Sequence, residues 1–352
     1  DKITVISFLG YIFFFSILHI VMDDNDISVT ERRALAKFPK FELNSDYITS
    51  VDGYLLDHFP LRDGFRSVKA NFNYNVLQKL DNNGIYLSGD YIFKSEYPTN
   101  KESINGFINK INKLSGLLTD DNNVYMMIVP DKNYYLESDN FLHIDYDYLY
   151  NEIDKLNYQM IDIRAIMNLE DYYETDTHWK QENLLKVIQE LGKVMNFKYE
   201  EYAYEKSVFN EFYGVYYGES AMKRKPEKIT ILSNEIIENA EVTYLENAEL
   251  NSVYNKDKLL GYDAYEVYLD GASAFIEIYN IENTIDKELI IFRDSFASSI
   301  TPLLTPYYKK ITLIDNRYIN SNNYLNLIDF TNQDILFMYS TLIINNSSTL
   351  KG

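Results

Sequence analysis

Residues 289–300 read LIIFRDSFASSI and place a serine between two apolar segments. The run LIIFR (289–293) shows no alternation of polar and apolar residues, which predicts a strand buried on both faces, as in a parallel sheet. The apolar residues after Phe296 predict a helix. Ser295 would therefore lie at the carboxyl end of a parallel strand, the edge at which open α/β sheets bind ligands.

Two interpretations of Asp294 and Ser295 remain open at the level of local sequence. In the first, Ser295 is a nucleophile, and its own N–H group, near a helix N-terminus, binds an oxyanion. In the second, the Asp-Ser pair only caps the helix, which is common N-cap chemistry.

The rest of the chain repeats the pattern of a helix followed by a buried strand. Apolar residues recur at helical spacing over 104–118 and 184–191, and the expected buried strands are VYMMIVP (124–130), ITLID (311–315) and ILFMYS (335–340). These predict an α/β fold with a mainly parallel sheet. Residues 200–285 are less regular, with alternating Tyr and Val, and predict a β-rich insertion.

The segment before this region predicts smaller elements. Apolar residues at spacings of three and four between positions 46 and 80 predict two short helices, broken at Pro60. The segment NGIYLSGDYIF (83–93) alternates between two glycines and predicts a hairpin.

The beginning of the chain predicts a membrane anchor. Residues 3–22, ITVISFLGYIFFFSILHIVM, contain no charged residue, and twenty helical residues cover about the 30 Å of a bilayer core. The acidic run at 23–26 replaces the small-residue cleavage site of a signal peptide. Lys2 before the segment and the acids after it place the N-terminus inside and the remainder outside. A buried core helix is the alternative.

The expected organisation is therefore a transmembrane anchor over 1–22, a polar stalk over 23–45, and an extracytoplasmic domain over 46–352. The expected location is the cell membrane, with a single pass and the soluble domain on the extracellular face.

Composition excludes several classes of function. The chain has 352 residues and a formal charge of −20, so it would repel nucleic acid, and its surface would also avoid anionic lipid headgroups. It has no cysteine, which excludes disulfides, thiolate nucleophiles and Cys-ligated metals. Asp145 and Asp147 lack further ligands at EF-hand spacing. We expect no metal and no cofactor.

His178 is the best candidate for a general base among the four histidines of the chain. Asp176 precedes it by two residues, and on an extended segment both side chains project to one face, where the carboxylate can hold the imidazole tautomer. Trp179, the only tryptophan, follows directly. A surface Asp-His pair before a helix is the other interpretation.

A series of segments, in this order, resembles the SGNH-hydrolase-like proteins of polysaccharide O-acetylation, in particular the AlgX/AlgJ-like group and the DHHW family. The resemblance covers most of the soluble part. The segments are ERRALAKFPKF (31–41), DHFPLRDGFRSVKA (57–70), VYMMIVPDKNYY (124–135), TDTHW (175–179), FYGVYYGESA (212–221), DAYEVYLDGASAFIEI (263–278) and RDSFASSITPLLTPYYKKITLIDNRY (293–318).

The resemblance implies a three-layer α/β/α domain in which Ser295 is the nucleophile, His178 the general base and Asp176 its orienting carboxylate. The order is permuted, because the histidine precedes the serine. Thr177 stands where the DHHW family has His. The segment DGA (270–272) stands where Gly-Asn is expected, so Gly271 is a candidate for either an oxyanion donor or a turn residue.

The resemblance also implies an O-acetyltransferase or acetylesterase that acts on a cell-surface or exported polysaccharide through an acetyl-serine intermediate. A membrane-bound O-acyltransferase would supply the acetyl group. Arg293 and Arg317 are candidates for holding an acidic glycan, with ordinary salt bridges as their alternative; Trp179 could stack on a sugar. A non-catalytic glycan-binding or assembly module that keeps an SGNH-like shell is the competing hypothesis.

Overall fold

The structure is a computed structural model that describes residues 1–136, 141–281, 283 and 285–351. Two residues of the expected β-rich segment, 282 and 284, lie outside the described residues. The helices are α1 (Lys2–Val21), α2 (Ser45–Asp57), α3 (Arg62–Asn71), α4 (Lys101–Ser115), α5 (Tyr146–Asp154), α6 (Leu185–Met195), α7 (Val215–Ser220), α8 (Glu235–Glu238), α9 (Ala297–Leu304), α10 (Ser321–Tyr324) and α11 (Thr341–Asn345). A π-helical turn, Phe72–Val76, continues α3.

Strands form one large sheet and three small ones in the described part of the chain. They are β1 (Ile27–Ser28), β2 (Arg33–Ala34), β3 (Asp81–Asn82), β4 (Ile85–Ser88), β5 (Tyr91–Lys94), β6 (Asn123–Val129), β7 (Gln159–Met160), β8 (Glu205–Phe212), β9 (Glu227–Ser233), β10 (Glu241–Tyr244), β11 (Phe275–Tyr279), β12 (Glu288–Arg293), β13 (Lys310–Ile314) and β14 (Asp334–Ser340).

The large sheet has the order β10-β11-β13-β12-β14-β6-β7. From β13 to β7 each neighbouring pair is parallel, whereas β10 and β11 are antiparallel to their neighbours. The expected helices and strands appear near the predicted positions. The prediction of an α/β fold with a mainly parallel sheet is confirmed.

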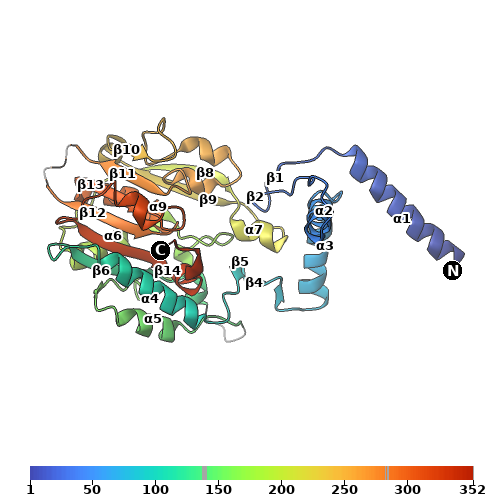
Figure 1. Cartoon of the computed structure of the whole chain (residues 1–352), viewed down its shortest axis with the longest axis horizontal. Coiled ribbons are helices and arrows are strands. Elements are labelled where there is room, and N and C mark those ends of the chain that lie inside the picture. Colours follow the sequence, from blue (N-terminus) through green and yellow to red (C-terminus); the bar gives the residue numbers. More distant parts are fainter. Residues whose placement is uncertain (137–140, 282, 284, 352) are drawn as a thin grey trace.

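The central strands are apolar on both faces because helices cover both faces. In β6, Met126 and Ile128 join the core that α4 and α5 complete, whereas Met127 and Val129 join the core that α6 and α9 complete. Side chains alternate between the two faces of a strand, so a strand between two helical layers has buried, apolar side chains on both faces. The result is the expected three-layer α/β/α arrangement (Figure 1).

The expected β-rich segment divides between two sheets. Among the described residues, strands β8 and β9 pair only with each other, whereas β10 and β11 extend the antiparallel edge of the large sheet. The division of the chain into anchor, stalk and domain stays a prediction.

The N-terminal helices lie to one side of the sheet, and α1 is the outermost of them (Figure 1). Within the described residues, α1 is the one helix that is long and apolar enough to cross a membrane, with a mean hydropathy of 2.1 and none of its most apolar window buried. The segment predicted as a stalk contains the β1–β2 hairpin.

Candidate active site

Ser295 lies in the short loop between β12 and α9, at the carboxyl end of the parallel strands. The neighbouring Asp294 holds this loop: its Oδ1 accepts the N–H of Phe296 at 3.0 Å, and its Oδ2 accepts the N–H of Ser340 at 2.7 Å. The aspartate therefore serves the local backbone and ties the loop to the end of β14. The Ser295 hydroxyl remains free for a different contact.

That contact is with His178, which lies 117 residues earlier in the chain. The distance from His178 Nε2 to Ser295 Oγ is 2.8 Å, and the distance from His178 Nδ1 to Asp176 Oδ1 is 2.6 Å. A carboxylate can only accept, so Nδ1 carries the proton and Nε2 is left to accept the serine O–H. The structure thus aligns Asp176, His178 and Ser295 in the geometry of a serine nucleophile with its base.

Asp176 is buried and bound on both oxygens. Its Oδ1 also accepts the backbone N–H of His178 at 3.1 Å, and its Oδ2 accepts the N–H of Val215 at 2.8 Å and the Arg32 guanidinium at 3.3 Å. Burial would raise the pKa of Asp176, but the hydrogen bond and charge of His178, the charge of Arg32 and the Val215 N–H together hold that pKa well below its usual range. Asp176 is therefore ionised near neutral pH.

Aromatic side chains fix the plane of the His178 ring. The Tyr265 ring stacks on the imidazole with centroids 3.9 Å apart and planes 8° apart. Trp179 is fully buried, and its Nε1–H lies 3.1 Å from the Phe296 carbonyl oxygen and 2.9 Å from Ser299 Oγ. Trp179 therefore joins the histidine segment to α9, and its burial removes it as a surface for sugar stacking.

The backbone before Asp176 is held by two buried or half-buried charges. The Glu227 carboxylate accepts the N–H groups of Glu174 and Thr175, both at 2.7 Å, and Lys132 Nζ donates to the carbonyls of Tyr173 and Glu174, both at 3.0 Å. Burial lowers the pKa of Lys132 to about 7. The segment that carries Asp176 and His178 is thus fixed at several backbone groups.

The two arginines of the prediction both bind groups of the protein itself. Arg293 is 1% exposed and donates to Ser298 Oγ at 2.7 Å and to the Ser273 carbonyl at 3.0 Å. Arg317 forms a two-point ion pair with Asp315, at 2.9 and 2.6 Å. Arg293 is enclosed because it is the last residue of a central strand, and Arg317 shows the salt bridge that was its alternative.

Gly271 lies in a turn with φ +76°, and its N–H is 3.3 Å from the Tyr268 carbonyl oxygen. A Cβ at this position would lie 2.7 Å from Cγ of Glu266. Of its two candidate roles, the turn is the one that this geometry supports. For the oxyanion, the Ser295 N–H remains the candidate, because no acceptor within the described residues takes it.

The contact between Arg32 and the candidate site was not predicted from the sequence. Arg32 Nη1 lies 2.8 Å from Asp263 Oδ1 as well as 3.3 Å from Asp176 Oδ2, and its Nη2 contacts the Tyr213 carbonyl. Asp263 Oδ1 in turn accepts the N–H of Tyr265, the ring of which stacks on His178. Arg32 therefore contacts both Asp176, which binds the His178 imidazole, and Asp263, which binds the backbone of Tyr265. The segment of Arg32, 31–41, is one of those that resemble the family, but nothing in it indicated contact with the site.

Solved structures share this arrangement of strands and helices. A DHHW family protein from Eubacterium siraeum matches with a TM-score of 0.64 and 18% identity, over 77% of this chain and 97% of its own. The chain has an SGNH-like fold. The structure of Bacillus cereus PatB1 with a sulfonyl adduct matches with a TM-score of 0.60 and 19% identity, over 74% and 95%. The O-acetyltransferase domain of Pseudomonas putida AlgJ reaches a TM-score of 0.46 at 11% identity, over 74% and 92%.

No family model and no curated protein matches the sequence. At identities of 18 and 19%, the similarity to the Eubacterium siraeum and Bacillus cereus proteins concerns the fold. The chemistry of this chain has to be argued from its own residues.

Proposed function

We propose that this protein is a membrane-anchored, extracytoplasmic O-acetyltransferase or acetylesterase that acts on a polysaccharide, with Ser295 as nucleophile, His178 as general base and Asp176 as orienting carboxylate. The observation that carries the proposal is the pair of distances, 2.8 Å from His178 to Ser295 and 2.6 Å from His178 to Asp176. Residues far apart in sequence meet in this order at the carboxyl edge of the sheet, where the fold places ligand sites.

The reaction begins when His178 Nε2 takes the proton of Ser295 Oγ as the oxygen bonds to an acetyl carbonyl carbon. The tetrahedral oxyanion is held by N–H donors, of which the Ser295 N–H is our candidate. When the intermediate collapses, the C–O bond to the donor breaks and the imidazolium returns the proton to the leaving oxygen. A sugar hydroxyl or water then repeats these steps on acetyl-Ser295, which yields an acetylated sugar or acetate.

One fold neighbour supports a reactive nucleophile. The structure of Bacillus cereus PatB1 is described with a sulfonyl adduct. A sulfonyl adduct forms on a reactive nucleophile, so we expect a sulfonyl fluoride to modify this chain at Ser295. The polysaccharide acceptor and a membrane-bound O-acyltransferase as acetyl source belong to the proposal.

The proposed location is the outer face of the cell membrane, with α1 as a single-pass anchor. The support is the length and apolar composition of α1, the exposure of its surface and the acidic residues Asp23, Asp24 and Asp26 that follow it. Full-length protein should remain with the membrane fraction after carbonate washing.

The test is turnover of an acetyl nitrophenyl ester by the full chain in nanodiscs, since this donor bypasses a membrane partner. Ser295→Ala and His178→Ala should each remove nearly all turnover, because members of a triad act as a unit. Asp176→Asn should reduce kcat by about 10⁴-fold through the wrong imidazole tautomer.

Matched controls use residues of the same type elsewhere. Ser348 and His143 are exposed, so Ser348→Ala and His143→Ala should leave turnover unchanged. Mass spectrometry should find the acetyl or sulfonyl group on the peptide that contains Ser295. Turnover that survives Ser295→Ala would refute the nucleophile, and no turnover in the parent protein would favour the glycan-binding module instead.

A further inference from the structure

An apolar stripe on α3 is exposed along most of its length in the described part of the chain. The stripe consists of Leu61, Phe65, Val68, Phe72 and Val76, which are between 43 and 68% exposed. Their spacings of four, three, four and four residues place them along one face of α3 and of the turn that continues it. An exposed apolar face of this length marks an interaction surface.

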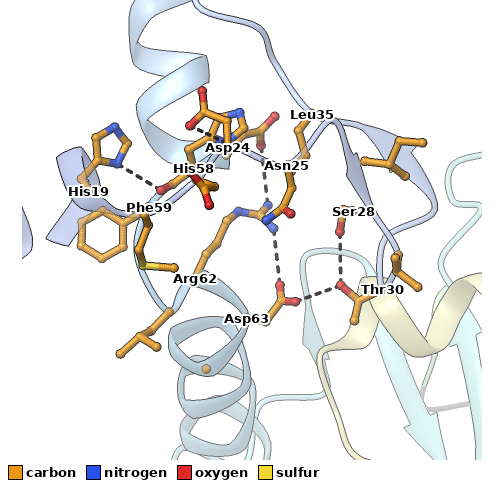
Figure 2. Close-up of a pocket in the computed structure, with 17 residues that line it drawn as sticks. His19, Asp24, Asn25, Ser28, Thr30, Leu35, His58, Phe59, Arg62 and Asp63 are labelled. Atoms are coloured by element: carbon orange, nitrogen blue, oxygen red, sulfur yellow. Dashed lines mark hydrogen bonds and ion pairs between the residues drawn. The ribbon is translucent and has the colours of Figure 1, made fainter.

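The polar face of α3 fixes the direction in which this stripe points. Arg62 and Arg66 pair with Glu31, and Arg66 also donates to the Gly218 carbonyl at 2.9 Å. Asp63 accepts the hydroxyl of Thr30 at 3.1 Å, and Figure 2 shows Arg62 and Asp63 directed toward this side. The helix therefore turns its charged side to the protein and its apolar stripe outward.

The stripe is continuous with the contact between α1 and the junction of α2 and α3. The Phe15 ring of α1 lies 5.3 Å from the Phe59 ring and 5.7 Å from the Phe65 ring, measured between centroids. One turn later, His19 Nδ1 lies 3.0 Å from the His58 carbonyl oxygen. A dashed line in Figure 2 marks this contact. Phe65 thus belongs both to the stripe and to the packing against α1.

If α1 spans a bilayer, these contacts determine how deep α3 lies in the membrane. Phe15 lies six residues before Val21, the last residue of α1, which is about 9 Å along a helix axis. Since all twenty residues of α1 are needed to cover about 30 Å of hydrocarbon, Phe15 lies inside the hydrocarbon, and Phe65 next to it lies at a similar level. Helices in the membrane interface bury their apolar face about 5 to 10 Å.

The charges of the α3 region also suit a lipid surface. Residues 61–80 contain four cationic side chains and one carboxylate, although the whole chain carries −20. Arg62 and Arg66 pair with Glu31, so the exposed Lys69 and Lys79 are the cations available to lipid headgroups. Cations near a membrane surface are attracted to anionic headgroups. The expectation that the protein avoids such lipids therefore does not extend to this segment.

We propose that α3 is an interfacial helix that lies in the outer leaflet with the stripe among the acyl chains, so that lipid, and not another protein, covers it. The inference rests on the proposed membrane anchoring and is independent of the esterase chemistry. The protein is then attached to the membrane at two places, because α1 crosses the bilayer and α3 lies along its surface.

Because the chain has no cysteine, a single introduced cysteine can be labelled at one defined position. Single variants of the full-length protein, Val68→Cys, Phe72→Cys, Phe13→Cys and Lys155→Cys, are labelled with a polarity-sensitive fluorophore. They are reconstituted into phosphatidylcholine–phosphatidylglycerol vesicles whose acyl chains are brominated close to the headgroup. Val68 is 68% exposed, so a label there disturbs no packing. Phe13 in α1 reports the anchor, and Lys155 at the end of α5 reports the body of the protein.

Labels at Val68 and Phe72 should lose roughly half of their emission or more to the brominated lipid, because the stripe lies at the depth of the bromines. The label at Lys155 should lose none. If the Phe13 label is quenched but those at Val68 and Phe72 are not, the anchor is supported and the interfacial helix is refuted. A blue-shifted but unquenched emission at Val68 would indicate that protein, such as a second copy of this chain, covers the stripe, and would also overturn the proposal. If the label at Phe13 is not quenched, both the proposed anchoring and the interfacial position of α3 are refuted.

Discussion

Replacement of Arg32 by methionine tests whether the segment after α1 contributes to the proposed catalysis. Arg32 lies 3.3 Å from Asp176 and 2.8 Å from Asp263, and its side chain is 7% exposed. Asp176 keeps three N–H donors without it, two from His178 and one from Val215. We therefore expect kcat to fall by about 10- to 100-fold, as for a displaced catalytic group, and not to vanish.

A 10- to 100-fold fall in kcat corresponds to an increase of about 1.4 to 2.7 kcal/mol in the activation free energy. The loss should stay within this range because the contacts of His178 with Asp176 and Ser295 do not involve Arg32.

The assay is ester turnover at one fixed pH, with Arg32→Lys and Arg33→Met as comparisons. Arg32→Lys keeps the charge and should lower kcat less than Arg32→Met does. Arg33 pairs with Asp57 and Glu31, so Arg33→Met should leave kcat unchanged. An Arg32→Met variant with the parent kcat would refute the reasoning, as would an equal fall in kcat in Arg33→Met.

Three further predictions follow from the same region. Trp179→Phe leaves the Phe296 carbonyl without its indole partner and should lower the free energy of unfolding by about 1 to 3 kcal/mol in thermal melts. Gly214→Ala should lower kcat by about 100-fold, because its Cβ would overlap the backbone of Thr175 and Asp176; an unchanged kcat would contradict this. Burial and the charge of Asp131 raise the pKa of Glu96 from 4.5 to about 7, so the folded protein binds more protons within that window and loses stability as pH rises through it. Glu96→Gln should raise Tm at pH 8 and leave it unchanged at pH 4; equal effects at both would exclude this titration.

The fold could be predicted because its central strands are unusual in sequence. Segments such as ILFMYS (335–340) are apolar on both faces only when helices cover both sides. The hairpin over 85–94 and the break at Pro60 follow from local turn chemistry in the same way. The antiparallel edge was less predictable, since β10 and β11 join the sheet through contacts distant in sequence.

The candidate site was predictable where its residues carry a local pattern. Asp176 and His178 form a short motif, and Ser295 follows a buried strand, so each could be identified as a candidate from the sequence alone. The structure then shows that the three side chains are in contact. Arg32 and Tyr265 have no such pattern, because only the folded chain brings them to His178. Arg293 was a candidate for holding an acidic glycan, yet its strand is central and its guanidinium donates to groups inside the protein.

The contact between Arg32 and Asp176 also limits where such an enzyme could work in a cell envelope. Arg32 is eleven residues beyond Val21, where α1 ends, and eleven residues span at most about 40 Å when fully extended. With α1 in the bilayer and Arg32 seated, the nucleophile cannot move farther outward than this tether and the width of the site allow. Polymer in the layer next to the membrane is within its reach, whereas polymer already carried to the outer part of a thick wall is not.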